Sequence, residues 1–171
     1  INCYNEERKE LDKRMTVEAS KVVAQMPEVD DKSAIVIYNA DWHKGVIGIV
    51  ASRLTEEFFR PAVVLTLDGD IVTGSARSVS GFDVYKAIQS CEDLLDNFGH
   101  TYAAGLSMKL EHVAEFTRRF EEYVHENIDP SQTLPNLDIH AFINFKDITP
   151  RFHSELKRMR PFGPDNPKPL F

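Results

Sequence analysis

Residues 33–38 read Ser-Ala-Ile-Val-Ile-Tyr, and residues 62–76 read Ala-Val-Val-Leu-Thr-Leu-Asp-Gly-Asp-Ile-Val-Thr-Gly-Ser-Ala. The first run is continuously apolar and of strand length, which indicates a strand buried on both faces of a sheet. The second run carries the turn signal Asp68-Gly69 between two apolar stretches, so its halves are predicted to pair as an antiparallel hairpin. Between the runs, the apolar residues of 46–58 recur on one helical face. This order of elements predicts an α/β domain with a mixed β-sheet flanked by helices.

The flanking sequence extends this pattern in both directions. Residues 83–95 and 111–127 have the apolar spacing of amphipathic helices, residues 97–100 read as a break, and residues 103–108 read as another strand. Upstream, a helix is predicted that ends at Pro27 and is either a surface helix of this domain or a connector from an upstream domain. Its apolar face is expected to hold Tyr4, Leu11, Met15, Val22 and Met26.

The C-terminal part of the chain is predicted to begin a second domain. Residues 137–143 alternate like a half-buried strand, and residues 149–160 read as a helix with Pro150 in its first turn. The chain begins without Met and stops where another strand would start, so we expect a piece of a longer protein. The expected segments are a connector helix (1–32), the α/β domain (33–129), a linker (130–136) and the incomplete second domain (137–171).

Composition and charge narrow the class of protein. The sequence has no apolar run near the roughly 18 residues that span a bilayer, and no signal-peptide layout. Cys3 and Cys91 are too remote to predict a disulfide framework or a metal site, so a cytoplasmic protein without a membrane partner is expected. The net charge of −7 argues against a broad basic surface for nucleic acid. It still allows a narrow site that holds one or two phosphates.

Three short segments could carry chemistry. Residues 41–45 precede a predicted helix, whose N-terminal N–H groups attract anions with His43 and Lys44 as further donors. The alternative is a loop whose Trp fills the core and whose His is solvated. Residues 74–78 place Ser75 and Arg77 on the same face of a strand, where a guanidinium fork and flanking hydroxyls suit phosphate. The alternative there is a surface strand with a solvated Arg.

The third segment, residues 99–105, is rich in small residues, which predicts a close approach of the backbone to a strand or a ligand. His100 is its one side chain suited to donating to a phosphate or stacking on a base. The sequence shows no cluster of carboxylates and histidines at metal-ligand spacing, no Ser/His/Asp order and no nucleotide-binding glycine fingerprint. It therefore predicts binding without a complete catalytic apparatus.

Together these segments resemble a known family. Residues 42–54, 74–78 and 99–105 are similar in order and spacing to the DHHA1 domain of the RecJ exonucleases, and residues 160–167 resemble the start of the OB-type domain that follows it. The resemblance implies the binding portion of a 5′-3′ exonuclease for single-stranded DNA, acting in DNA repair and recombination. Its Mn²⁺ or Mg²⁺ would be held by an upstream DHH domain, with no cofactor in this chain. The partners implied are single-stranded DNA and the DHH and OB-type domains of the same chain.

By the same resemblance, Ser75 and Arg77, with Ser78 beside them, would contact a terminal or near-terminal phosphate. The residues implied to line the path of the strand are Gly99, His100, Ala103, Ala104 and Gly105, with His43 as a neighbour. The family has two glycines before the histidine, whereas this chain has Phe98 and Gly99, which puts the placement of His100 in doubt.

Two alternatives remain at this point. One is a related DHH-family phosphodiesterase for short oligoribonucleotides or cyclic dinucleotides, although such enzymes end before a segment like 138–171. The other is an interaction module with no enzymatic parent, which the net acidity favours.

Overall fold

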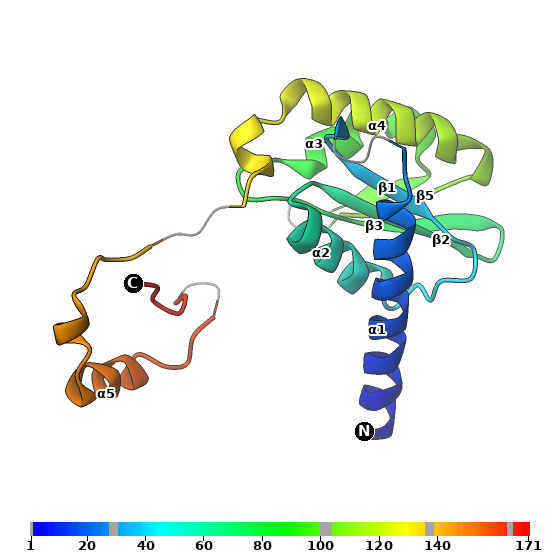
Figure 1. Cartoon of the computed structure of the whole chain (residues 1–171). Helices are drawn as coiled ribbons and strands as arrows, with labels where there is room; N and C mark the ends of the chain where they lie inside the picture. Colours follow the sequence, from blue (N-terminus) through cyan, green and yellow to red (C-terminus); the bar gives the residue numbers. More distant parts are fainter. Residues whose placement is uncertain (1, 28–30, 100–103, 136–138, 164–165) are drawn as a thin grey trace. The chain divides into compact units, whose positions relative to one another are not determined.

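The computed structural model describes residues 2–27, 31–99, 104–135, 139–163 and 166–171 (Figure 1). The chain divides into two compact units, Ile1–Leu134 and Pro135–Phe171. Within the described residues, no helix combines the length and apolar character that crossing a membrane requires.

A five-stranded sheet in the order β1-β2-β3-β5-β4 forms the centre of the first unit. β1 runs parallel to β2, and the other neighbouring strands are antiparallel, so the predicted mixed sheet is confirmed. The predicted hairpin joins β2 to β3, and Gly69 turns the chain with a φ of 67° that favours glycine. The strands are β1 (Ile35–Tyr38), β2 (Ala62–Asp68), β3 (Ile71–Arg77), β4 (Asn97–Gly99) and β5 (Ala104–Met108).

Two helices cover one whole face of this sheet (Figure 1). α3 (Val84–Gln89) and α4 (Val113–Asn127) pack their apolar sides on alternate residues of the strands, as the spacing of apolar residues predicts. Phe116 and Phe120 of α4 stack with ring centroids 5.6 Å apart and are completely buried.

The opposite face is covered only in part. α1 (Asn2–Ala24) packs on β1 and on α2 (Ile47–Phe58), and α2 packs over β2 and part of β3. Side chains of β1 and β2 form a second apolar cluster with these helices. The predicted face of α1 is confirmed at Met15, which is buried, and at Leu11, which packs against this cluster, as does Met26 just after the helix. It is wrong at Val22, which is 39% exposed. Over β3, β5 and β4 the same face carries residues that are exposed or half-buried.

Three predicted elements differ from the structure. The helix expected over 83–95 ends at Gln89 and is followed by a separate 3-10 turn, Glu92–Leu94. The expected break at 97–100 contains β4, which pairs with β5. No strand forms over the described residues 139–143, where Phe142 is 93% exposed. The last two errors concern strand pairing with distant segments, which local residue patterns do not encode.

The second unit contains one α-helix in its described residues. α5 (Pro150–Arg158) begins after Thr149, whose hydroxyl accepts a hydrogen bond from the N–H of Phe152, so the predicted helix is confirmed. The 3-10 turn Phe145–Asp147 precedes it. His140 donates its N–H to the carbonyl of Leu170 at 2.9 Å, which joins the two ends of the unit.

Candidate functional site

Ser75 and Arg77 lie on the same face of β3, as strand alternation predicts. Nη1 of Arg77 donates to Oγ of Ser75 at 2.9 Å and to the carbonyl of Ala76 at 2.8 Å. β3 has a partner strand on each side, so the backbone beneath these side chains is held by the sheet. The guanidinium is therefore fixed beside the hydroxyl over the middle of the sheet.

The charge of Arg77 has no carboxylate partner among the described residues. The side chain is half-buried, and this burial lowers the pKa of the Arg77 guanidinium below its ordinary value. Arginine still keeps its charge at neutral pH because its ordinary pKa is so high. A partly desolvated cation without a counter-charge favours binding of an anion.

The first turn of α2 lies directly against this pair. A Cβ atom placed on Gly48 would lie 3.0 Å from Nη2 of Arg77 and 3.1 Å from Oγ of Ser75. The N–H groups of Ile49 and Val50 both bond to the carbonyl of Val46, whereas those of Ile47 and Gly48 have no backbone acceptor among the described residues. The structure thus joins two of the predicted segments, a helix N-terminus and the Ser75–Arg77 pair, into one place suited to an anion.

The loop before α2 is held mainly by contacts to the core. Trp42 is buried, and its carbonyl accepts a 2.6 Å hydrogen bond from the hydroxyl of Thr66 on β2. His43 is exposed, and its Nδ1 accepts the N–H of Gly45 at 3.1 Å. Lys44 forms an ion pair with Asp68 at 2.8 Å. The Trp therefore fills the core, and the His and Lys side chains have partners within the protein, Gly45 and Asp68.

An open polar surface continues from Ser75 across the sheet. In register, Ser75 is opposite Gly105, which is opposite Gly99, and a Cβ on either glycine would meet nothing within 4 Å. The next row consists of Thr73, Ser107 and Asn97. We call these two rows the open face, and all of their residues except Ser75 line a hollow of about 340 Å³.

The remaining predicted site residues divide into three groups. Ser78 donates its hydroxyl to the carbonyl of Phe82 at 2.7 Å, which holds the loop after β3. Ala104 points to the opposite face and is completely buried in the core, so its side chain does not line the open face. His100 and Ala103 lie outside the described residues.

Sequence reasoning missed Gly48 and the row formed by Thr73, Ser107 and Asn97. The signal available for Gly48 was a glycine inside a helical pattern, where alanine is the more favourable residue. The three polar residues carry no local signal, because they become neighbours only through strand pairing. Gly74, in contrast, serves the core, since a Cβ there would collide with Leu65 Cδ2.

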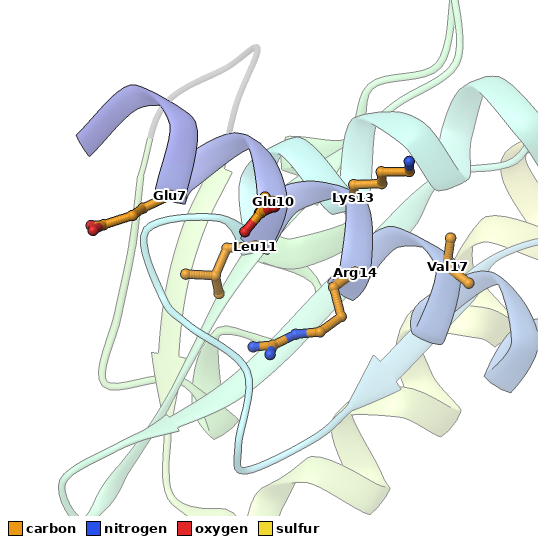
Figure 2. Close-up of a pocket in the computed structure, with 6 residues that line it drawn as sticks. All are labelled: Glu7, Glu10, Leu11, Lys13, Arg14 and Val17. Atoms are coloured by element: carbon orange, nitrogen blue, oxygen red, sulfur yellow. The ribbon is translucent and has the colours of Figure 1, made fainter. Parts of the chain in front are cut away.

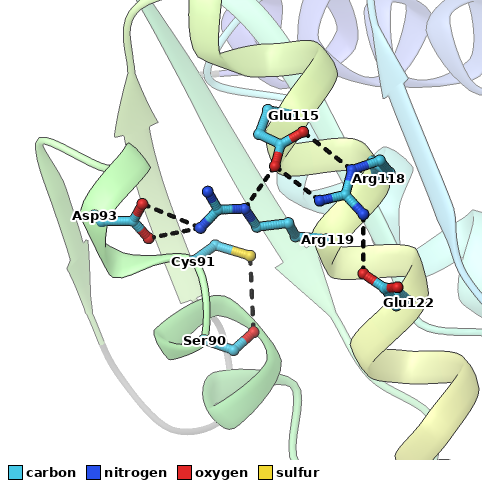
Figure 3. Close-up of polar contacts among 7 residues, drawn as sticks. All are labelled: Ser90, Cys91, Asp93, Glu115, Arg118, Arg119 and Glu122. Carbon is cyan, nitrogen blue, oxygen red and sulfur yellow. Dashed lines mark hydrogen bonds and ion pairs between the residues drawn. The ribbon is translucent and has the colours of Figure 1, made fainter.

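Two other places in the first unit differ from this site. A depression of about 580 Å³ lies along α1. Its lining residues, drawn in Figure 2, all belong to that helix, and one helix cannot enclose a ligand. Figure 3 shows Arg118 and Arg119 of α4 bonded to carboxylates, including both oxygens of Asp93 at 3.0 Å. Among the described residues, no three His, Cys, Asp or Glu side chains group as metal ligands.

The fold and site define an α/β domain with a place suited to an anion between a helix N-terminus and a mixed sheet. The chain belongs to the DHHA1 domain family, whose model matches residues 31–126. Residues 139–171 match the RecJ OB domain model. Both assignments confirm the resemblance seen in the sequence.

Similar proteins carry the RecJ name. The chain is 38% identical over 172 residues to the single-stranded-DNA-specific exonuclease RecJ of Bacillus subtilis, covering 99% of this chain and 22% of the relative. It is 31% identical to the Escherichia coli protein of that name, covering all of this chain and 31% of the relative. The crystal structure of Thermus thermophilus RecJ with Mg²⁺ matches 98% of this chain and 25% of its own, with a TM-score of 0.81 and 30% identity. The chain therefore spans about a quarter of the length of these proteins.

Proposed function

We propose that this chain is the single-stranded-DNA-binding part of a RecJ-like 5′-3′ exonuclease that acts in DNA repair and recombination in the cytoplasm. The observation that carries the proposal is the unpaired, half-buried Arg77 beside Ser75 at the N-terminus of α2. The relatives named as single-stranded-DNA-specific exonucleases support it. The match of residues 139–171 to the RecJ OB domain favours this function over that of a DHH phosphodiesterase for short substrates.

In this proposal each group has a distinct task at a phosphate near the end of the strand. Arg77 donates through the free edge of its guanidinium, and the hydroxyl of Ser75 and the N–H groups of Ile47 and Gly48 supply further donors. The flat floor at Gly99 and Gly105 leaves room for the sugar and base of the adjoining nucleotides. This chain holds and orients the strand.

Hydrolysis belongs, in the same proposal, to an upstream DHH domain that holds Mn²⁺ or Mg²⁺. The described residues of this chain hold no group of side chains that fits such a metal. Metal-dependent cleavage is therefore expected only when that domain is present, and the chain alone should bind without cutting.

A titration with a 5′-phosphorylated single-stranded oligonucleotide at low salt tests the binding. Arg77→Ala removes charge-assisted hydrogen bonds worth about 1.5–3 kcal/mol, so the affinity should fall roughly 10- to 100-fold. Arg118→Ala is the matched control, because it removes the same charge from α4 on the covered face of the sheet. Equal affinities for the unmodified chain and Arg77→Ala would refute the assignment of Arg77.

A further inference from the structure

Gly48 occupies a position where its conformation does not call for glycine. It is the second residue of α2, and positive φ angles among the described glycines occur only at Gly69 and Gly81. Alanine would fit this backbone and would favour the helix, because glycine is among the least favourable residues in a helix. The reason for a glycine therefore lies in what surrounds it.

The missing side chain leaves room for Arg77. A Cβ on Gly48 would lie 3.0 Å from Nη2, 3.1 Å from Oγ of Ser75 and 3.8 Å from Cζ of Arg77. The first two separations are shorter than ordinary van der Waals contact of carbon, which begins at about 3.5 Å. Any side chain at position 48 would press on the guanidinium and the hydroxyl together.

Arg77 is restrained from moving away. Its Nη1 is bonded to Ser75 at 2.9 Å and to the carbonyl of Ala76 at 2.8 Å, both on the strand that carries it. Ser75 is paired with Val64 on one side and Gly105 on the other, so the strand itself is fixed. A shift of the guanidinium by a few tenths of an ångström would therefore strain or break one of these hydrogen bonds.

We propose that Gly48 is a positioning residue for the phosphate site: its lack of a side chain sets where the Arg77 fork lies against the first turn of α2. The inference rests on the proposed function, since it concerns how that site holds a phosphate of single-stranded DNA. Gly48 acts through Arg77. Because glycine is less favourable in a helix than alanine, the first turn of α2 is less stable than it would be with alanine at this position.

A double-mutant cycle separates this role from a structural one. Gly48→Ala, Arg77→Ala and the double variant are titrated with a 5′-phosphorylated single-stranded oligonucleotide, and their melting temperatures are measured. Gly48→Ala should weaken binding by a factor on the order of three to ten, with an unchanged or higher melting temperature. In the Arg77→Ala background the same change should weaken binding much less, because most of its effect passes through the guanidinium.

An NMR measurement without DNA supplies a second readout. The Nε–H signal of Arg77 should shift in Gly48→Ala, while the signals of Arg118 and Arg119 stay in place. An unmoved Arg77 signal, or a loss of affinity that is equally large in the Arg77→Ala background, would overturn the proposal. So would a melting temperature that falls equally in both backgrounds, because Gly48 would then serve packing. If Arg77→Ala itself binds normally, it is the proposed function that fails, and the NMR shift still tests the positioning.

Discussion

At the scale of single residues, the site depends on the shape of Arg77 as well as its charge. One nitrogen of the guanidinium is engaged by Ser75 and the carbonyl of Ala76, which leaves the other edge of the same planar group for a ligand. Lysine would supply a comparable charge as a single point, and it could not serve both the strand and a phosphate in this way.

Arg77→Lys should therefore bind single-stranded DNA more weakly than the unmodified chain and more tightly than Arg77→Ala. The expected loss is roughly tenfold, because the charge is kept while the bidentate geometry is lost. Fluorescence anisotropy with one labelled oligonucleotide and all three proteins would measure it. An affinity equal to that of the unmodified chain would mean that a point charge suffices at this place.

At the scale of elements, the two faces of the sheet differ in how their charges are arranged. On the covered face, Arg118 and Arg119 of α4 hydrogen-bond to Glu115, and together they lower the pKa of the Glu115 carboxyl from 4.5 to about 2 (Figure 3). Arg119 also reaches Asp93, which ties the 3-10 turn Glu92–Leu94 to α4. These cations have partners within the protein, whereas Arg77 has no carboxylate partner among the described residues.

Acid should weaken the contribution of Glu115 to the stability of the folded chain over a defined pH range. A carboxyl whose pKa is lower in the folded than in the unfolded state stabilises the folded protein at pH values above the unfolded-state pKa. For Glu115 this stabilisation is lost as the pH falls from about 4.5 to about 2. Glu115→Gln should lower the melting temperature slightly at neutral pH, since these groups are exposed, and the difference should vanish by about pH 2. Glu126→Gln on the same helix is the control, because no described residue pairs with Glu126. A difference that is constant with pH would contradict the role of the carboxylate charge.

The individual elements also show how much of the fold and of the candidate site can be predicted from the sequence. The hairpin, α4 and the shared face of Ser75 and Arg77 follow from local apolar periodicity and strand alternation, and the structure bears them out. β4 could not be predicted from its three residues, because its existence depends on pairing with β5. The contact of Gly48 with Arg77 depends on how α2 packs on the sheet, which no spacing along the chain reveals.

At the scale of the whole molecule, the net negative charge is compatible with a narrow site that holds one or two phosphates. A chain with a net charge of −7 offers little general attraction to nucleic acid, so the proposed binding would rest on a few well-placed donors. In the first unit the proposed donors, Ser75 and Arg77 of β3, lie against the first turn of α2, at the edge of the open face. Helices α3 and α4 close the other face with apolar contacts.

Mapping the backbone amide signals of the isotope-labelled chain by NMR, during titration with a short 5′-phosphorylated single strand at low salt, would locate the bound strand on this unit. The signals expected to move belong to the first turn of α2, to Ser75 and Arg77 on β3, and to Gly105 on β5, while those of α3 and α4 stay in place. Shifts concentrated on α3 and α4, or no shifts in the first unit at saturating oligonucleotide, would contradict the placement of single-stranded DNA on the open face.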